Sequence, residues 1–150
     1  MNLNSNALLE KKALQLIKMK ETKKHQKEYL RLKISTLEDR IDLPVTSLKC
    51  VVIKDNMGWC DDIKFPKKYN KLIKINKKFK HEKLKRKDHK YDLLIPIKYN
   101  FKKPVAGLGS CIFIHLTKDY NPTAGCIALK KKDFLIMLKL IKKNSKIKII

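Results

Sequence analysis

The sequence predicts a β-rich domain that is closed by a helix. Apolar residues in its second half gather into short runs, such as 93–95 and 112–114, whose length is typical of buried strands. Over residues 131–142, by contrast, apolar side chains recur at helical spacing. A chain of 150 residues is long enough for one domain with its own core. We therefore expect one β-rich unit with a C-terminal helix.

The first part of the chain has a different pattern. Leucine, isoleucine and alanine recur at helical spacing ahead of a lysine-rich stretch, which predicts an amphipathic helix over residues 7–33. Residues 1–10 lack the basic start and apolar stretch of a secretory signal, so no signal peptide is visible in this chain. No run approaches the ~20 apolar residues that a membrane-spanning helix needs.

Local composition also predicts the order of the elements after residue 43. Pro96 indicates that the strand around it ends or bulges there, because proline cannot donate to a sheet. The other expected elements are a strand at 48–53, a turn at 55–56, a compact turn at 58–62, an irregular connection over 63–80, a short charged helix over 81–90, strands at 91–97 and 111–116, a loop over 117–125 and a short strand at 147–150.

The chain is strongly basic, with 37 lysines and arginines against 14 acidic residues and a formal net charge of +23. Such a charge suffices for binding phosphates. Only three of the cations are arginine, however, the residue that usually reads base edges and grips phosphates with two bonds. Lysine, isoleucine and asparagine share A/T-rich codons, so gene composition also explains the bias. A lysine-rich nucleic-acid-binding module stays open as an alternative function, as does attraction to another anionic polymer such as a cell envelope.

The four cysteines, Cys50, Cys60, Cys111 and Cys126, have no metal-binding spacing. No CxxC pair and no suitably spaced pair of histidines accompanies them, so we predict no zinc site. An even number of cysteines permits two disulfides, but the spacing favours no framework. We predict neither a metal nor a cofactor.

His115 and Cys126 form the pair with the clearest chemical potential. A cysteine thiol is mostly protonated at neutral pH, and a neighbouring imidazole can take its proton and make it a nucleophile for acyl transfer. Gly125 lets the backbone turn tightly, so that amides around Gly125 and Cys126 can face a developing oxyanion. The alternative is that Cys126 is a small buried hydrophobe and His115 a core histidine.

Two stretches around this pair resemble a known family. Residues 109–116, Gly-Ser-Cys-Ile-Phe-Ile-His-Leu, and 122–129, Pro-Thr-Ala-Gly-Cys-Ile-Ala-Leu, resemble the catalytic stretch of the L,D-transpeptidase (YkuD-type) family, in a compact branch that carries Thr-x-Gly-Cys. The resemblance covers about residues 38–150. Five shorter matches support it: Gly58–Asp62, Tyr69–Asn70, His81–Glu82, Arg86–Asp88 and Tyr91–Asp92.

The resemblance implies a mainly β fold with mixed sheets and a bacterial cell-wall enzyme. Cys126 would attack a carbonyl in a peptidoglycan stem peptide, His115 would activate the thiol, and the acyl group would pass to an amine of a second stem as a 3→3 cross-link. The family's location implies the cell envelope or periplasm. Ala124 departs from the usual motif, which has a second histidine there, and the loop after His115 is short. These departures leave room for water as acceptor, and so for a hydrolytic, carboxypeptidase-like relative or an inactive one.

Four further residues are candidates for a substrate-binding or a structural role: Thr123, Trp59, Asp61 and Asp62. The two aspartates could hold an amine of a stem peptide or orient His115. Alternatively, the segment around Trp59 is a turn in which the indole is buried and an aspartate caps the backbone. The second interpretation is favoured.

Residues 1–37 match nothing in the family, and we hypothesise that they are a frame-shifted remnant of its N-terminal region. In the frame that joins the third base of each codon to the first two of the next, residues 19–28 permit Glu-Gly-Asp-Lys-Lys-Thr-Pro-Lys-Gly. This peptide resembles the family's Glu-Gly-Asp-x-x-Thr-Pro-x-Gly loop. The chain would then consist of an atypical segment, 1–37, and a catalytic domain, 38–150. The coding DNA tests the idea, because it requires a single-base slip near codon 38.

Overall fold

The apolar runs of the sequence form most of one five-stranded sheet in the computed structural model, which describes residues 31–35, 40 and 42–147. The strand order is β2-β1-β6-β7-β8. The pairs β1–β2 and β7–β8 are parallel, whereas β1–β6 and β6–β7 are antiparallel, so the sheet is mixed as expected. The strands span Arg31–Ile34 (β1), Lys49–Val52 (β2), Leu93–Pro96 (β6), Phe113–Leu116 (β7) and Ile127–Leu129 (β8).

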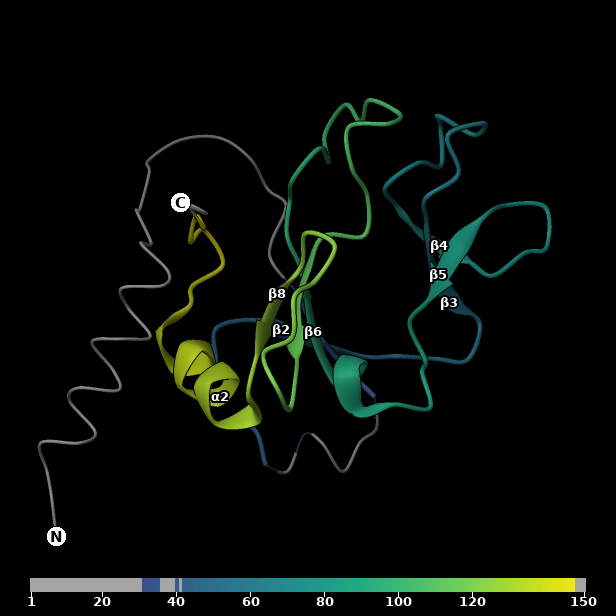
Figure 1. The fold of residues 1–150 in the computed structure, drawn as a ribbon. Coiled ribbons are helices and arrows are strands. Elements are labelled where there is room, and N and C mark those ends of the chain that lie inside the picture. Colours follow the sequence, from purple (N-terminus) through teal and green to yellow (C-terminus); the bar gives the residue numbers. More distant parts are fainter. Residues whose placement is uncertain (1–30, 36–39, 41, 148–150) are drawn as a thin grey trace, which may run out of the picture.

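A second, three-stranded sheet is antiparallel and has the order β4-β3-β5. Its strands are Met57–Cys60 (β3), Leu72–Lys74 (β4) and His81–Lys83 (β5). A single 3₁₀ turn, η2 (His89–Tyr91), connects it to β6. Figure 1 shows this small sheet on one side of the five-stranded sheet and the α-helix on the other.

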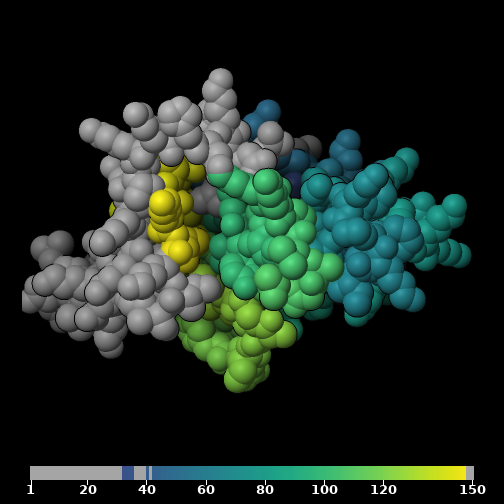
Figure 2. Space-filling model, turned by 90° about the horizontal axis from the view of Figure 1, so that it is seen from above, coloured from purple at the N-terminus to yellow at the C-terminus, as the bar shows by residue number. Residues whose placement is uncertain are grey.

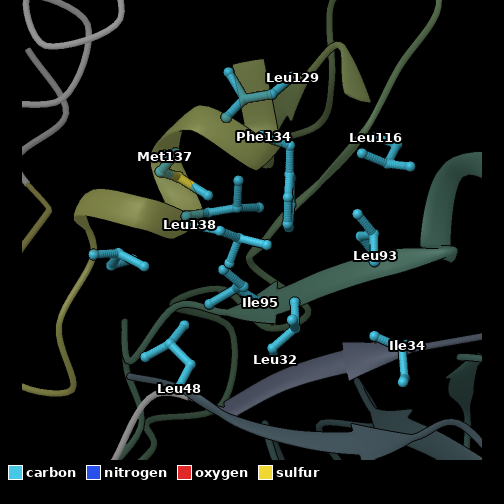
Figure 3. Close-up of a cluster of buried hydrophobic side chains, with 12 residues drawn as sticks. Leu32, Ile34, Leu48, Leu93, Ile95, Leu116, Leu129, Phe134, Met137 and Leu138 are labelled. Atoms are coloured by element: carbon cyan, nitrogen blue, oxygen red, sulfur yellow. The ribbon is translucent and has the colours of Figure 1, made fainter. Parts of the chain in front are cut away.

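The helix α2 (Lys131–Leu140) covers one face of the large sheet and confirms the predicted C-terminal helix. Side chains alternate across a strand, so every second strand residue points at the helix. Figure 3 shows the resulting cluster, in which Phe134 and Leu138 of α2 lie over Leu32 and Ile95 of the sheet. All four are fully buried. Within the part of the chain that the structure describes, no helix is long and apolar enough to cross a bilayer.

The opposite face of the large sheet carries a second, more aromatic cluster between the two sheets. It contains Ile53, Trp59, Leu84, Tyr91, Leu94 and Phe113, with Cys111 and Cys126 packed against it. In the space-filling view of Figure 2, residues of the small sheet form the right-hand end of the molecule, next to the green segment that precedes β7. The predicted nucleophile therefore lies on the face that the small sheet approaches.

The helix predicted over residues 7–33 is wrong at its end, because residues 31–33 belong to β1. Leu32 and Ile34 lie two residues apart on β1, between β2 and β6, and both are fully buried. Burial in the sheet therefore outweighs the helical spacing of apolar residues in this segment. The rest of the predicted helix, over 7–30, lies outside the described residues. β1 also lies ahead of the boundary placed at residue 38.

Three expectations for the charged middle of the chain are also wrong. The compact turn at 58–62 is largely strand β3, the connection over 63–80 contains β4, and the helix over 81–90 is replaced by β5 and η2. These strands are short, and β4 and β5 carry polar residues on solvent-facing edges, so they lack the apolar alternation by which a strand is predicted.

The remaining expectations concern the apolar strands, one turn and the last residues of the chain. Strands at 48–53, 91–97 and 111–116 and the turn at 55–56 are confirmed, and β6 ends at Pro96. Of the strand expected at 147–150, Ile147 is not in a strand, and 148–150 lie outside the described residues.

Candidate functional site

His115 and Cys126 project from the same face of two neighbouring parallel strands. His115 pairs with Ala128, and Cys126 lies two residues before Ala128 at the entrance to β8. Because side chains alternate along an extended chain, Cys126, Ala128 and His115 share one face of the sheet. His115 is 7% exposed and Cys126 is half-buried. The fold thus brings the predicted base and nucleophile to one face of the sheet, where Tyr91 packs on His115 and the aromatic cluster packs on Cys126.

A backbone carbonyl orients the imidazole of His115. Nδ1 donates a hydrogen bond to the carbonyl of Leu116 at 2.8 Å, since that oxygen can only accept. Nδ1 therefore carries the proton and Nε2 is left as the acceptor. The ring of Tyr91 packs against the imidazole at 63°, with centroids 5.6 Å apart. The histidine is held in the tautomer that can accept a proton through Nε2.

The thiol of Cys126 is protonated and hydrogen-bonded in the resting structure. Its Sγ donates to the carbonyl of Cys111 at 3.3 Å. Burial raises the pKa of Cys126, the charge of Glu82 raises it further, and the backbone N–H of Phe113 opposes both by favouring the thiolate. Because a raised pKa disfavours the nucleophilic thiolate, a neighbouring base would activate this thiol.

The backbone bend before Cys126 depends on Gly125 and Thr123. Gly125 has φ +110°, a conformation that side chains disfavour, and an added Cβ would meet Ile112 Cδ1 at 3.3 Å. The hydroxyl of Thr123 donates to the carbonyl of Cys126 at 2.6 Å. Thr123 therefore stabilises the bend. Of the two roles considered for Thr123, substrate binding and structure, this contact is a structural one.

Trp59 likewise has a structural role, centred on Asn70. The indole is 4% exposed and its Nε1 donates to Asn70 Oδ1 at 2.9 Å. Asn70 in turn donates to the carbonyls of Tyr99 and Asn100, at 2.9 and 2.7 Å. The hydroxyl of Ser110 makes a longer, bifurcated bond to the same Oδ1, at 3.3 Å, because its single proton is shared with the Cys60 carbonyl. Asn70 thereby joins β3 to the segment that leads to Cys111.

Cys111 is held at the small sheet by two polar contacts. The neighbouring Ser110 hydroxyl donates to the Cys60 carbonyl at 2.9 Å, and Cys111 Sγ donates to the Trp59 carbonyl at 3.8 Å. Burial raises the pKa of Cys111 to about 12. Burial therefore disfavours the Cys111 thiolate, and the Cys111 carbonyl accepts the hydrogen bond of the Cys126 thiol.

The two aspartates make no bond to His115 among the described residues. Asp62 accepts the backbone N–H groups of Lys64 and Lys80, both at 3.0 Å, and these bonds lower its pKa. It thus caps the loop as the structural interpretation predicted. Asp61 faces Lys80 at 3.7 Å through Oδ2, whereas Oδ1 is buried with no hydrogen-bond partner in the described part of the chain.

Glu82, Tyr91 and Arg86 form a polar group beside the aromatic cluster that contacts Cys126, and the sequence alone predicted no role for them. The Tyr91 hydroxyl donates to Glu82 Oε1, and Arg86 lies 3.6 Å from the same oxygen. Arg86 also stacks over the Tyr91 ring at 5.0 Å and forms two bonds to Asp88, at 2.7 and 2.9 Å. These three residues lie in the supporting motifs His81–Glu82, Arg86–Asp88 and Tyr91–Asp92. Those motifs are the sequence signal from which the residues could have been found.

All four cysteines are free thiols in the structure. Among residues 31–35, 40 and 42–147, no three His, Cys, Asp or Glu side chains gather as metal ligands would. No protein-family model, curated protein or solved structure matches the chain.

Proposed function

We propose that the chain is a cysteine acyltransferase of the L,D-transpeptidase type, acting on peptidoglycan stem peptides in the cell envelope. Cys126 is the nucleophile and His115 its base. The observation that supports the proposal is that Cys126 and His115 lie on one face of the sheet, at the neighbouring strands β8 and β7, while Nδ1 of His115 donates to the Leu116 carbonyl. The resemblance of residues 109–129 supports the choice of substrate.

The reaction follows from these groups. Nε2 of His115 takes the thiol proton as Sγ of Cys126 attacks the substrate carbonyl, and a tetrahedral oxyanion forms. The amides around Gly125 and Cys126 stabilise its charge. The imidazolium then returns the proton to the leaving amine, the carbon–nitrogen bond breaks, and an acyl-enzyme remains. An amine of a second stem, or water, attacks the thioester and restores the thiol.

Acylation by a carbapenem tests the proposal. Mass spectrometry of the intact protein should show one adduct, mapped to Cys126 and absent from Cys126→Ala. His115→Ala should slow acylation by about 10²–10⁴, the usual contribution of a positioned base. Cys50→Ala is the matched control, because Cys50 lies on β2 and packs in the other core. An adduct on Cys60 or Cys111 would contradict the assignment.

Ala124 provides a second test. We expect activity without a histidine at this position, because the proposal assigns the base to His115 alone. If Ala124→His turned an inert protein into an active one, the missing histidine would be the defect. The chain would then be a non-catalytic relative.

A further inference from the structure

The connection between β6 and β7, residues 97–110, exposes apolar side chains at its tip. Figure 1 shows it as a long green loop that projects beyond the end of the large sheet, at the top of the view. Residues 105–108, Val-Ala-Gly-Leu, are all exposed, with Val105 at 54% and Leu108 at 59%. Tyr99 is also 54% exposed. A run of four exposed apolar residues is unfavourable in water unless it contacts a partner.

Hydrogen bonds fix the shape of this loop. The side chain of Asn100 donates to the carbonyls of Val105 and Gly109, both at 2.9 Å, and accepts the backbone N–H of Val105 at 2.8 Å. The N–H of Leu108 closes a turn by donating to the Val105 carbonyl at 3.2 Å. Asn70 holds the start of the loop through two backbone carbonyls. The apolar tip is therefore preformed, so that contact with a partner costs little conformational entropy.

The charge around the loop is positive. Residues 93–118, which contain the loop, include no aspartate or glutamate, and neither do residues 63–80. The second segment lies beside the loop, because its Asn70 bonds to the loop backbone. Exposed lysines of the two segments include Lys67, Lys68, Lys71, Lys102 and Lys103. This end of the molecule thus combines exposed apolar side chains with lysines.

An anionic lipid bilayer is complementary to both properties. Aliphatic side chains gain free energy when they enter the boundary between headgroups and acyl chains, and lysines beside them attract anionic headgroups. A nucleic acid or another polyanion would satisfy the lysines alone, because a charged backbone offers no apolar phase to Val105 and Leu108. The apolar tip therefore favours a membrane surface over a polyanion.

We propose that residues 97–110 dock the protein on the surface of an anionic lipid bilayer. Val105 and Leu108 enter the boundary below the headgroups, and the neighbouring lysines contact the headgroups. Cys111 follows this loop, and its carbonyl accepts the Cys126 thiol at 3.3 Å, so the docked protein holds the candidate site close to the bilayer. This surface does not depend on the proposed chemistry of Cys126.

Sedimentation with phospholipid vesicles tests the proposal. The wild-type chain should bind vesicles made of equal parts phosphatidylglycerol and phosphatidylcholine. Val105→Ser/Leu108→Ser keeps the charge and should bind them at least about tenfold more weakly, since two half-exposed aliphatic side chains no longer leave water. The matched control is Val45→Ser/Leu140→Ser, which makes the same two changes at exposed positions outside the loop and should bind as wild type does.

Lys102→Gln/Lys103→Gln tests the charged part of the surface. Each lysine near an anionic surface contributes about fivefold to binding, so this variant should bind about 25-fold more weakly. Equal affinities for wild type and both loop variants would show attraction by net charge alone and would overturn the proposal.

The remaining outcomes separate the membrane from other partners. Binding of double-stranded DNA or purified peptidoglycan in place of vesicles, with the same dependence on Val105 and Leu108, would also overturn the proposal. If the double serine variant does not fold, Leu108→Ser alone decides, and unchanged vesicle binding overturns the proposal. Carbapenem acylation of Cys126 without vesicles is a separate measurement, whose failure refutes the proposed enzyme and leaves vesicle binding as it is.

Discussion

Asn70→Ala should destabilise this protein more than most single substitutions, although Asn70 makes no contact with the nucleophile. Asn70 is 3% exposed, and its amide makes four hydrogen bonds, to Trp59, Tyr99, Asn100 and Ser110. Alanine removes all four. It also leaves the buried Trp59 indole N–H without its acceptor.

The magnitude follows from these bonds. A typical hydrogen bond contributes about 0.5–1.5 kcal/mol net, and a buried donor left unsatisfied costs about 1–3 kcal/mol. Allowing for non-additivity, we expect a loss of about 3–5 kcal/mol in the free energy of unfolding. For a chain of this size that corresponds to a fall in Tm of about 6–20 °C. Total stability is about 5–15 kcal/mol, so the variant would be only marginally folded.

Urea unfolding followed by tryptophan fluorescence measures this loss. Trp59 is the chain's single tryptophan and bonds directly to Asn70, so the probe reports on the perturbed contact. Asn70→Gly is the control, because it removes the same four bonds. Asn70 has φ +53°, where glycine carries no penalty, so glycine should be about 1–2 kcal/mol less destabilising than alanine. A loss below 1 kcal/mol in Asn70→Ala would refute the reasoning.

Three further outcomes are expected. Phe134→Ala empties a fully buried site under α2 and should cost about 3–5 kcal/mol in urea unfolding; a cost below 1 kcal/mol would contradict the packing in Figure 3. Gly125→Ala should slow acylation of Cys126, because the bend at φ +110° becomes strained by about 1–3 kcal/mol; an unchanged rate would show that the bend tolerates a side chain. Arg86 lowers the pKa of Asp88 from 3.8 to about 2, so the contribution of this carboxylate is complete above pH 3.8 and is lost as the pH falls towards 2. Asp88→Asn should therefore lose less stability than wild type between pH 4 and pH 2, and equal slopes in thermal melts would refute this.

The elements predicted correctly are those whose signal is local. The runs around Leu94 and Ile114 are apolar because they are buried, and Phe134 and Leu138 repeat at the helical period for the same reason. The strands of the small sheet are three or four residues long, and β4 and β5 contain no buried residue. Their stability depends on pairing with each other, which no window of sequence reports.

Sequence alone determined the apolar strands and the C-terminal helix, and it is the source of the proposal that His115 and Cys126 are a pair for acyl transfer. Only the tertiary structure decided what surrounds them. Glu82 of β5 bonds to Tyr91 of η2, and Asn70 bonds to segments about 30 residues further along the chain. These contacts are between polar residues without periodicity, and they come together only when the strands pair. That is why the partners of Glu82 and Asn70 could be identified only from the fold.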